Sequence, residues 1–276
     1  MKIPTIMLAG ILIVASMTTI ALLAPLIASL VPHERSSEPF APPNSRNILG
    51  TNDLGDDVFV EIIYGARLSM AIGFLAALIV VLIGLSIGVL AGYYHGSLID
   101  EVLSMITDIL LVIPVLPLAI VLTVYLEPSF WNVVLVIGLL WWPSTARVIR
   151  ARVAQLRSME FVSYLKSLGA SDLYIILRHI VPNVIEILIA RFILAVPKAI
   201  LFEAGLAFLG LSDPNHLSWG LMLHYALTRG GLLRGAWWTF IPPGLCIAIT
   251  ALGFMLIGMS LEEKISGIKV IKVREL

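Results

Sequence analysis

Four charged side chains lie within otherwise apolar stretches of the sequence, where burying a charge is energetically costly. They are Asp108, Arg191, Lys198 and Glu203. Charged groups inside a membrane almost always face a water-filled path or a partner. Because Arg191 and Lys198 are seven residues apart, they share one face of a helix. We therefore predict that these residues line a pathway, with Lys198 as the first candidate.

A structural alternative remains open for each of these charges. Asp108 fits a hydrogen-bonded position inside a helix bundle as well as it fits a cavity. Arg191 can reach the membrane surface through its long side chain. Lys198 and Glu203 can pair with each other or with a partner subunit.

The common motifs of enzyme chemistry are absent from the sequence or lie outside the context they require. There is no GxxxxGK[ST] loop for nucleotide phosphates and no HExxH pair for zinc, and the one GxSxG pattern, Gly84 to Gly88, lies inside an apolar span rather than at a strand-to-helix turn. The single cysteine excludes a disulfide within the chain and a cysteine-based metal site. The five histidines lack the spacing of metal ligands; they are His33, His95, His179, His216 and His224. We predict no catalytic residue, no metal and no cofactor.

The composition indicates an integral membrane protein. Of the 276 residues, 59% are hydrophobic and only 13% are charged, and the mean hydropathy is +1.00. Soluble domains have a charged share of about 25%. Basic residues flank the apolar stretches and do not alternate with stacking aromatic residues, which excludes a nucleic-acid-binding face. We find no internal repeat and no soluble second domain.

We expect six spans across the bilayer, which needs about 20 residues per helix. Five lie at residues 6–31, 68–94, 102–126, 184–206 and 239–260, and the fourth in chain order begins with residues 133–145 and continues as a helix to residue 157. The first is too long for the apolar part of a cleaved signal peptide, which has about 7 to 15 residues, so we expect a retained anchor. In the second span, Gly84, Gly88 and Gly92 would let a neighbouring helix approach closely.

The expected division of the chain follows from these spans. A first transmembrane helix over 1–31 precedes an extracytoplasmic loop over 32–67, whose residues 58–67 form an interfacial helix. A five-helix core follows over 68–260. It contains a cytoplasmic loop over 152–182 and an outer loop over 207–238 with an interfacial or re-entrant helix at 219–227. Residues 261–276 form a cytoplasmic tail.

A charged stretch separates the fourth and fifth spans, and it reads EFVSYLKSLGASDLYIILRHIVPN from Glu160 to Asn183. A third of the chain's 18 lysines and arginines lie in or near it: Arg147, Arg150, Arg152, Arg157, Lys166 and Arg178. Cytoplasmic loops carry an excess of basic residues. We therefore place this loop and, with six spans, both termini in the cytoplasm.

The same stretch predicts a helix, a tight turn and a second helix. Ser158 can cap the first helix, and Gly169 can end it in the left-handed conformation. Ser171 or Asp172 can cap the second helix, which we expect to end at Pro182.

This pattern resembles the coupling loop of ABC importer permeases. Gly169 matches the central glycine, and the segment His179-Ile180-Val181-Pro182 matches the ending. Ser163-Tyr164-Leu165 stands where the family usually has Glu-Ala-Ala. The resemblance implies that partner ATPases contact the following residues: Glu160, Ser163, Tyr164, Leu165, Gly169, Ala170, Asp172 and Pro182.

Four further stretches resemble the dipeptide, oligopeptide and nickel branch of that family. They are LGTNDLGDDV from Leu49, YGAR from Tyr64, FEAGLAFLGL from Phe202 and SWG from Ser218. In the first, Asn52 and Asp56 stand where the branch usually has Asp and Arg.

The resemblance implies an all-α integral membrane protein with six transmembrane helices and the type I ABC importer permease architecture. Such a subunit would lie in the plasma (inner) membrane of a prokaryote. It would work with a homologous second permease, two ABC ATPases and an extracytoplasmic substrate-binding protein. Peptides are the first choice of substrate, with nickel and oligosaccharides as alternatives. A different hypothesis is an ion-coupled secondary transporter that uses Asp108, Lys198 and Glu203 as a relay.

Overall fold

The computed structural model describes residues 4–27 and 38–266, and within these ranges the fold is built from helices alone. The long helices are α1 (Thr5–Ile27), α2 (Val58–Tyr93), α5 (Phe130–Arg157), α8 (Val181–Phe208) and α10 (Ile241–Ser266). The short helices are α3 (Leu98–Val112), α4 (Val115–Tyr125), α6 (Glu160–Ser167), α7 (Asp172–Ile175) and α9 (Trp219–Thr228). A π-helical turn, Ile176–Ile180, joins α7 to α8, and a short 3-10 helix, Trp237–Thr239, precedes α10.

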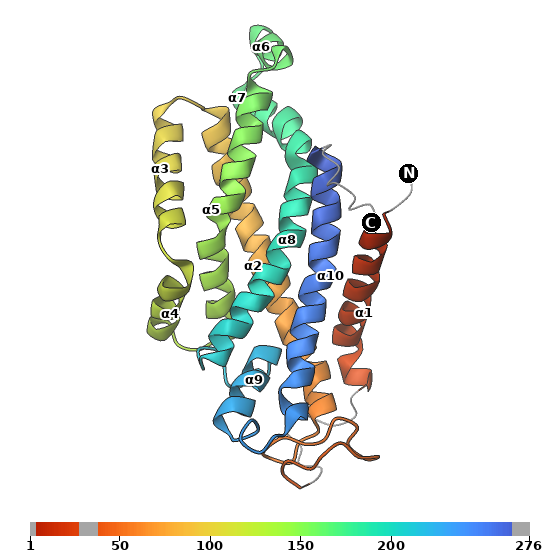
Figure 1. Ribbon diagram of the computed structural model, residues 1–276. Helices are drawn as coiled ribbons and strands as arrows, with labels where there is room; N and C mark the ends of the chain where they lie inside the picture. Colours follow the sequence, from red (N-terminus) through yellow and green to blue (C-terminus); the bar gives the residue numbers. More distant parts are fainter. Residues whose placement is uncertain (1–3, 28–37, 267–276) are drawn as a thin grey trace, which may run out of the picture.

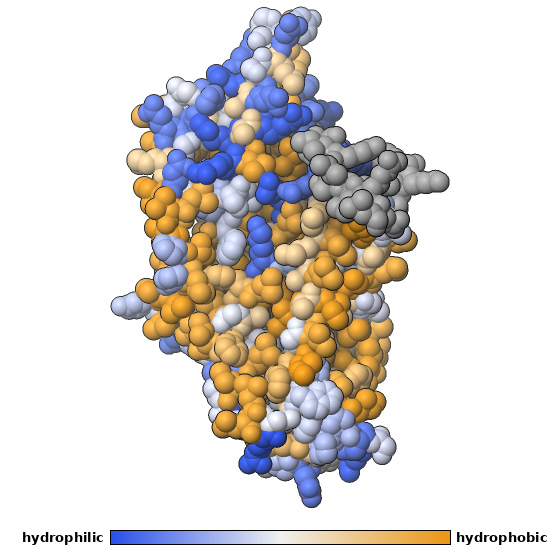
Figure 2. All heavy atoms as spheres, in the orientation of Figure 1, coloured by the Kyte–Doolittle hydropathy of each residue, from blue (hydrophilic) through white to orange (hydrophobic). Residues whose placement is uncertain are grey.

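The long helices run side by side, with α6 and α7 projecting from one end of the bundle and α9 lying at the other (Figure 1). We call these the tip end and the α9 end. The start of α1 and the end of α10 both lie toward the tip end. Hydrophobic residues form a broad belt around the middle of the molecule, and hydrophilic residues gather at both ends (Figure 2). This distribution matches a bilayer with water on either side.

Four helical segments are long and apolar enough to cross a membrane. They are Thr5–Ile27, Val58–Tyr93, Phe130–Arg157 and Trp237–Lys264. The pair α3 and α4 makes a fifth span if it is counted as one, but it bends by 91° between the two helices. We expected a single span over residues 102–126 there. The break falls at Pro114, which cannot donate a backbone hydrogen bond and disfavours a helical residue before it.

The helix α2 also differs from expectation, because it runs unbroken through 36 residues. We predicted a separate interfacial helix over 58–67. Instead, the Asp57 carboxylate accepts a hydrogen bond from the Phe59 amide (2.8 Å) and caps the helix that continues to Tyr93. No proline interrupts the segment, so nothing in the backbone divides it.

Glycines in α2 let α5 approach closely, as the four-residue spacing predicted. A Cβ atom added at Gly84 would lie 2.8 Å from Cβ of Thr145, and one added at Gly88 would lie 2.7 Å from the Ala146 carbonyl oxygen. At Gly92, the added atom would lie 2.5 Å from the Arg150 carbonyl oxygen. The stripe therefore fixes the α2–α5 contact at backbone distance.

We expect Gly88→Ala to lower the melting temperature of the detergent-purified protein by about 5 °C, because the added methyl group forces α5 away at a cost of about 1 to 3 kcal/mol. Gly244→Ala in α10 is the matched control, since a Cβ atom there meets nothing within 4 Å. It should leave the melting temperature unchanged or raise it slightly through helix propensity. Equal melting temperatures for the two variants would contradict the close α2–α5 contact.

Candidate functional site

The tip is built around the turn between α6 and α7. Gly169 adopts a φ of +80°, the left-handed conformation that the sequence predicted. The Gly169 amide donates to the Lys166 carbonyl (3.0 Å), and the Ala170 amide donates to the Leu165 carbonyl (3.1 Å), which closes the end of α6. A Cβ atom at Gly169 would meet nothing within 4 Å, so the backbone conformation alone favours glycine here.

The helix ends on either side of the turn correct two predictions. Ser158 does not cap α6, because its hydroxyl donates to the Gln155 carbonyl (2.8 Å) at the end of α5. The second helix does not end at Pro182, because the π-helical turn carries it directly into α8. Pro182 lies in the first turn of α8, where a missing amide hydrogen is tolerated. The expected cap of α7 is Ser171, whose hydroxyl accepts from the Tyr174 amide (3.3 Å).

Asp172 ties the tip to the end of α2. Its carboxylate accepts a hydrogen bond from the Tyr93 hydroxyl (2.7 Å) and a longer one from the Tyr94 hydroxyl (3.4 Å). Lys166 completes the cluster, with its ammonium 3.1 Å from the Asp172 carboxylate and 5.2 Å from the centre of the Tyr93 ring. The Tyr93 hydrogen bond and then Lys166 hold the pKa of Asp172 below its ordinary value. The sequence pointed to Asp172 but not to the two tyrosines, which are about 80 residues away in the chain.

The inner face of the tip is packed and apolar. Val162, Ile175 and Ile180 are buried against Tyr93 of α2 and Val153 of α5. This cluster holds α6 and α7 to the bundle. It also explains why Leu165 and Ala170, predicted to contact an ATPase, are only partly accessible.

The outer face of the tip carries apolar side chains in contact with solvent. Tyr164, Leu168 and Leu173 are each about two-thirds exposed, and Tyr174 and Leu177 are also exposed. The predicted contact residues Glu160, Ser163, Gly169 and Pro182 are exposed as well. We did not single out Leu168, Leu173 and Leu177 from the sequence. The helical spacing of Leu173 and Leu177, opposite the buried isoleucines, was a usable signal for an exposed apolar face. An exposed apolar surface of this kind is typical of a protein-docking site.

A cavity between α5 and α8 contains two of the four predicted pathway residues. Its lining includes Trp141, Ser144, Arg191 and Lys198. The Lys198 ammonium lies 5.8 Å from the centre of the Trp141 ring, and within the described chain it forms no ion pair. Arg191 lies 3.4 Å from a Glu262 oxygen. A hydrophilic patch interrupts the hydrophobic belt over these helices (Figure 2).

The other two candidates lie elsewhere. Asp108 pairs with Arg147 of α5 (2.6 Å) beside a separate cavity near the tip end. Glu203 is only 1% exposed and accepts a hydrogen bond from the Ser218 hydroxyl (2.7 Å). Neither Asp108 nor Glu203 lines the Lys198 cavity. The four charges therefore do not form one group.

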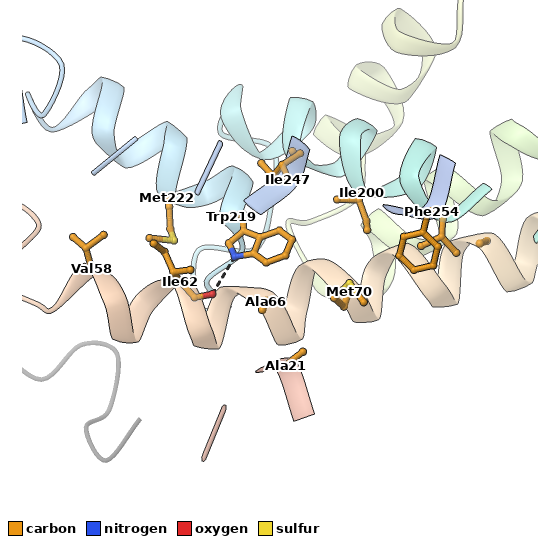
Figure 3. Packing of buried hydrophobic residues seen from close by; sticks show 13 residues of the cluster. Ala21, Val58, Ile62, Ala66, Met70, Ile200, Trp219, Met222, Ile247 and Phe254 are labelled. Carbon is orange, nitrogen blue, oxygen red and sulfur yellow. Dashed lines mark hydrogen bonds between the residues drawn. The ribbon is translucent and has the colours of Figure 1, made fainter. Parts of the chain in front are cut away.

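Trp219 forms a buried joint at the α9 end. Its indole nitrogen donates to the Ile62 carbonyl (3.0 Å; Figure 3). Its backbone amide donates to the Ser69 hydroxyl (3.1 Å). Gly65 and Gly220 allow the close packing, since a Cβ atom at Gly220 would lie 2.5 Å from Cα of Ala204. The stretches YGAR, FEAGLAFLGL and SWG, far apart in sequence, thus meet at one place.

Within the part of the chain that the structure describes, no group of three or more His, Cys, Asp or Glu residues is arranged to hold a metal ion. Two of the histidines lie beside carboxylates, with His95 2.8 Å from Asp100 and His216 2.8 Å from Asp213. His33 lies outside the described residues.

Comparison with known families identifies the class of this protein. The family model of binding-protein-dependent transport system inner membrane components matches residues 84–266. The chain belongs to this family, which confirms the resemblance found in the motifs. It is a multi-pass membrane subunit of an ABC transport system, and it is a transport subunit rather than an enzyme.

Individual relatives extend the similarity to most of the chain. The dipeptide transport system permease protein DppC of Alkalihalophilus pseudofirmus is 37% identical over 256 residues, which cover 92% of this chain and 83% of the relative. The oligopeptide transport system permease protein OppC of Bacillus subtilis is 37% identical over 223 residues, covering 80% and 72%. The glutathione transport system permease protein GsiD of Pectobacterium atrosepticum is 34% identical over 222 residues, with the same coverage.

We expect Tyr93→Phe to loosen the tip, because it removes the short hydrogen bond to Asp172. Amide hydrogen exchange over residues 160–180 should become about fivefold faster at pH 7, which corresponds to about 1 kcal/mol for a half-exposed charged hydrogen bond. Tyr94→Phe is the matched control and should have little effect, since its hydroxyl is 3.4 Å from the carboxylate.

The same pair of variants tests the pH dependence. Since the pKa of Asp172 is lowered in the folded protein, its contribution to stability is present above the unfolded pKa of about 3.9 and is lost as the pH falls through the folded value. The difference between Tyr93→Phe and the wild type should therefore shrink below about pH 4. A difference that stays constant down to pH 2 would rule out the ionised carboxylate as the partner.

Proposed function

We propose that this chain is one of two membrane subunits of an ATP-driven, binding-protein-dependent importer of di- or oligopeptides. The similarity to peptide-transport permeases carries the proposal, because relatives named for dipeptide, oligopeptide and glutathione transport each cover at least 80% of the chain. None of these three names refers to a metal or a sugar. Nickel and oligosaccharides are therefore less favoured substrates.

The proposed membrane arrangement has six spans, which is the type I ABC importer architecture. To the four candidate spans and the bent α3–α4 pair it adds α8. This helix has 28 residues, about 42 Å, and packs between α2 and α10. Its charges at Glu186, Arg191, Lys198 and Glu203 explain why it is less apolar than the others. Six passes and the basic loop support a cytoplasmic location for the tip and both termini.

The proposed coupling mechanism uses the tip as a lever. ATP binding would close two partner ATPases, and their movement would displace α6 and α7 through the exposed surface around Tyr164, Leu168 and Leu173. Because α7 continues into α8, the displacement would act directly on the helix that carries Lys198 and Arg191. The spans would then alternate between inward-open and outward-open states, with a homologous second permease opposite and a binding protein supplying solute at the α9 end.

The proposed solute pathway passes the Lys198 cavity. An exposed ammonium without an ion pair in the described chain, next to an aromatic ring, is suited to a solute with carboxylate and apolar groups. The separation of Asp108, Lys198 and Glu203 speaks against the alternative of an ion-coupled relay. Asp108 and Glu203 have protein partners of their own, Arg147 and Ser218.

We expect Gly169→Val to uncouple ATP hydrolysis from uptake, because a β-branched residue is strained at a φ of +80°. Peptide uptake by the reconstituted complex should fall at least tenfold. Gly169→Asn should keep most of the activity, since asparagine tolerates this conformation. Gly230→Val is the matched control, with a φ of +90° and no atom within 4 Å of its Cβ, but after α9 at the opposite end of the bundle. Normal coupling in Gly169→Val would refute the lever.

We expect Lys198→Met to reduce peptide uptake about tenfold, because it removes the free positive charge from the proposed pathway while keeping the length of the side chain. Lys198→Arg should retain most of the uptake. The measurement is uptake of labelled peptide by proteoliposomes that contain the whole complex. Unchanged uptake in Lys198→Met would exclude this cavity from the pathway.

A further inference from the structure

A third cavity opens at the α9 end of the bundle, and the proposed pathway does not assign it a role. Its volume is ≈ 610 Å³, within the range of about 300 to 1,000 Å³ that is typical of small-molecule sites. The polar members of its lining are Tyr64, Arg67, Asn215 and His216, and the apolar members are Leu68, Ala71, Phe130 and Leu217. We call it the outer cavity.

Arg67 supplies the positive charge of the outer cavity. Its side chain is exposed, and within residues 4–27 and 38–266 no carboxylate forms an ion pair with it. A guanidinium group is always charged and matches the geometry of a carboxylate with two parallel hydrogen bonds. In the YGAR stretch, Gly65 packs against Trp219, whereas Arg67 forms no ion pair within the described part of the chain.

Asp213 holds two polar residues of the outer cavity's lining, Asn215 and His216, in place. This buried carboxylate accepts hydrogen bonds from the Asn215 amide (2.9 Å) and side chain (3.1 Å), and His216 Nδ1 lies 2.8 Å from its other oxygen. Burial raises the pKa of Asp213, but these hydrogen bonds outweigh it and the pKa is lowered overall. The Asp213 carboxylate is thus hydrogen-bonded by Asn215 and His216, and it forms no ion pair with Arg67.

The outer cavity and the Lys198 cavity follow one face of α5. Phe130 lines the first, and Ile137, Trp141 and Ser144 line the second. The intervals of seven, four and three residues place these four side chains on the same side of the helix. The two cavities therefore lie along the same face of α5, separated in this conformation by core packing around Ile137.

We propose that the outer cavity binds the C-terminal carboxylate of a peptide as it enters the permease, with Arg67 as the principal ligand and Asn215 and His216 as further hydrogen-bonding groups. The apolar wall of Phe130, Leu68 and Leu217 then contacts the last side chain of the peptide. This inference rests on the proposed peptide-import function and deepens it. A concave site on the same face of α5 as the Lys198 cavity fits a solute better than it fits an acidic side chain of the binding protein.

The test uses the whole complex in proteoliposomes, with binding protein that has been preloaded with either trialanine or trialanine amide. Uptake is measured as a function of the concentration of loaded binding protein. Every permease variant receives the same loaded protein, so any preference of the binding protein for one peptide affects all variants equally. Arg67→Gln should raise the KM for trialanine about tenfold and change the KM for the amide less than twofold. Arg67→Lys should recover most of the loss for trialanine.

Arg46→Gln is the matched control, because Arg46 is also exposed in the loop at the α9 end but does not line the outer cavity. It should leave the KM for both peptides unchanged. An equal rise in KM for both peptides in Arg67→Gln would indicate docking of the binding protein and overturn the proposal, as would no change for either. If the wild-type complex takes up neither peptide, the peptide-import function fails together with this site, whereas uptake that does not depend on Arg67 overturns the site alone.

Discussion

The burial of Trp219 is the contact on which the α9 end of the bundle depends. Its side chain lies among residues of α2, α8 and α10 (Figure 3), and its indole and backbone nitrogens each hydrogen-bond to α2. A buried indole needs such a partner, because an unpaired N–H group in an apolar core costs about 1 to 3 kcal/mol. Ser218 and Glu203 extend the joint to α8. One short segment therefore holds three helices that are far apart in the chain.

The helix α8 connects this joint to the tip. At one end Glu203 receives the Ser218 hydroxyl, in the middle Arg191 and Lys198 line a cavity, and at the other end Val184 packs in the cluster beneath α6 and α7. Because α7 passes into α8 without a break, no flexible linker separates the exposed surface from the cavity. The π-helical turn keeps the hydrogen-bonded backbone continuous across Pro182.

The sequence predicted those features that depend on a few neighbouring residues. The left-handed turn at Gly169 and the close approach along Gly84, Gly88 and Gly92 follow from the missing side chain, and both are present. The helix end expected at Pro182 was wrong, because a proline in the first turn of a continuing helix is compatible with it. Residues 58–67 do not form a helix of their own, because they are the first part of α2.

Long-range partners lay beyond the sequence alone. The motifs singled out Asp172 and Trp219, but their hydrogen bonds reach residues between 78 and 157 positions away. The charges within the apolar stretches were easy to find, yet their partners depend on how the helices are rotated. Asp108 meets Arg147 and Glu203 meets Ser218, and nothing in the local pattern distinguishes them from Lys198.

The length of α2 determines how the protein responds to the lipid around it. Its 36 residues span about 54 Å, whereas the hydrocarbon core of a bilayer is about 30 Å thick. Protein contacts hold both ends of the helix, with Trp219 near the first and Asp172 at the last. A bilayer that is a few Å thicker or thinner covers more or less of α2 without pulling on either attachment. The mismatch falls instead on the shorter, lipid-exposed α1 and on the bent α3–α4 pair at the periphery.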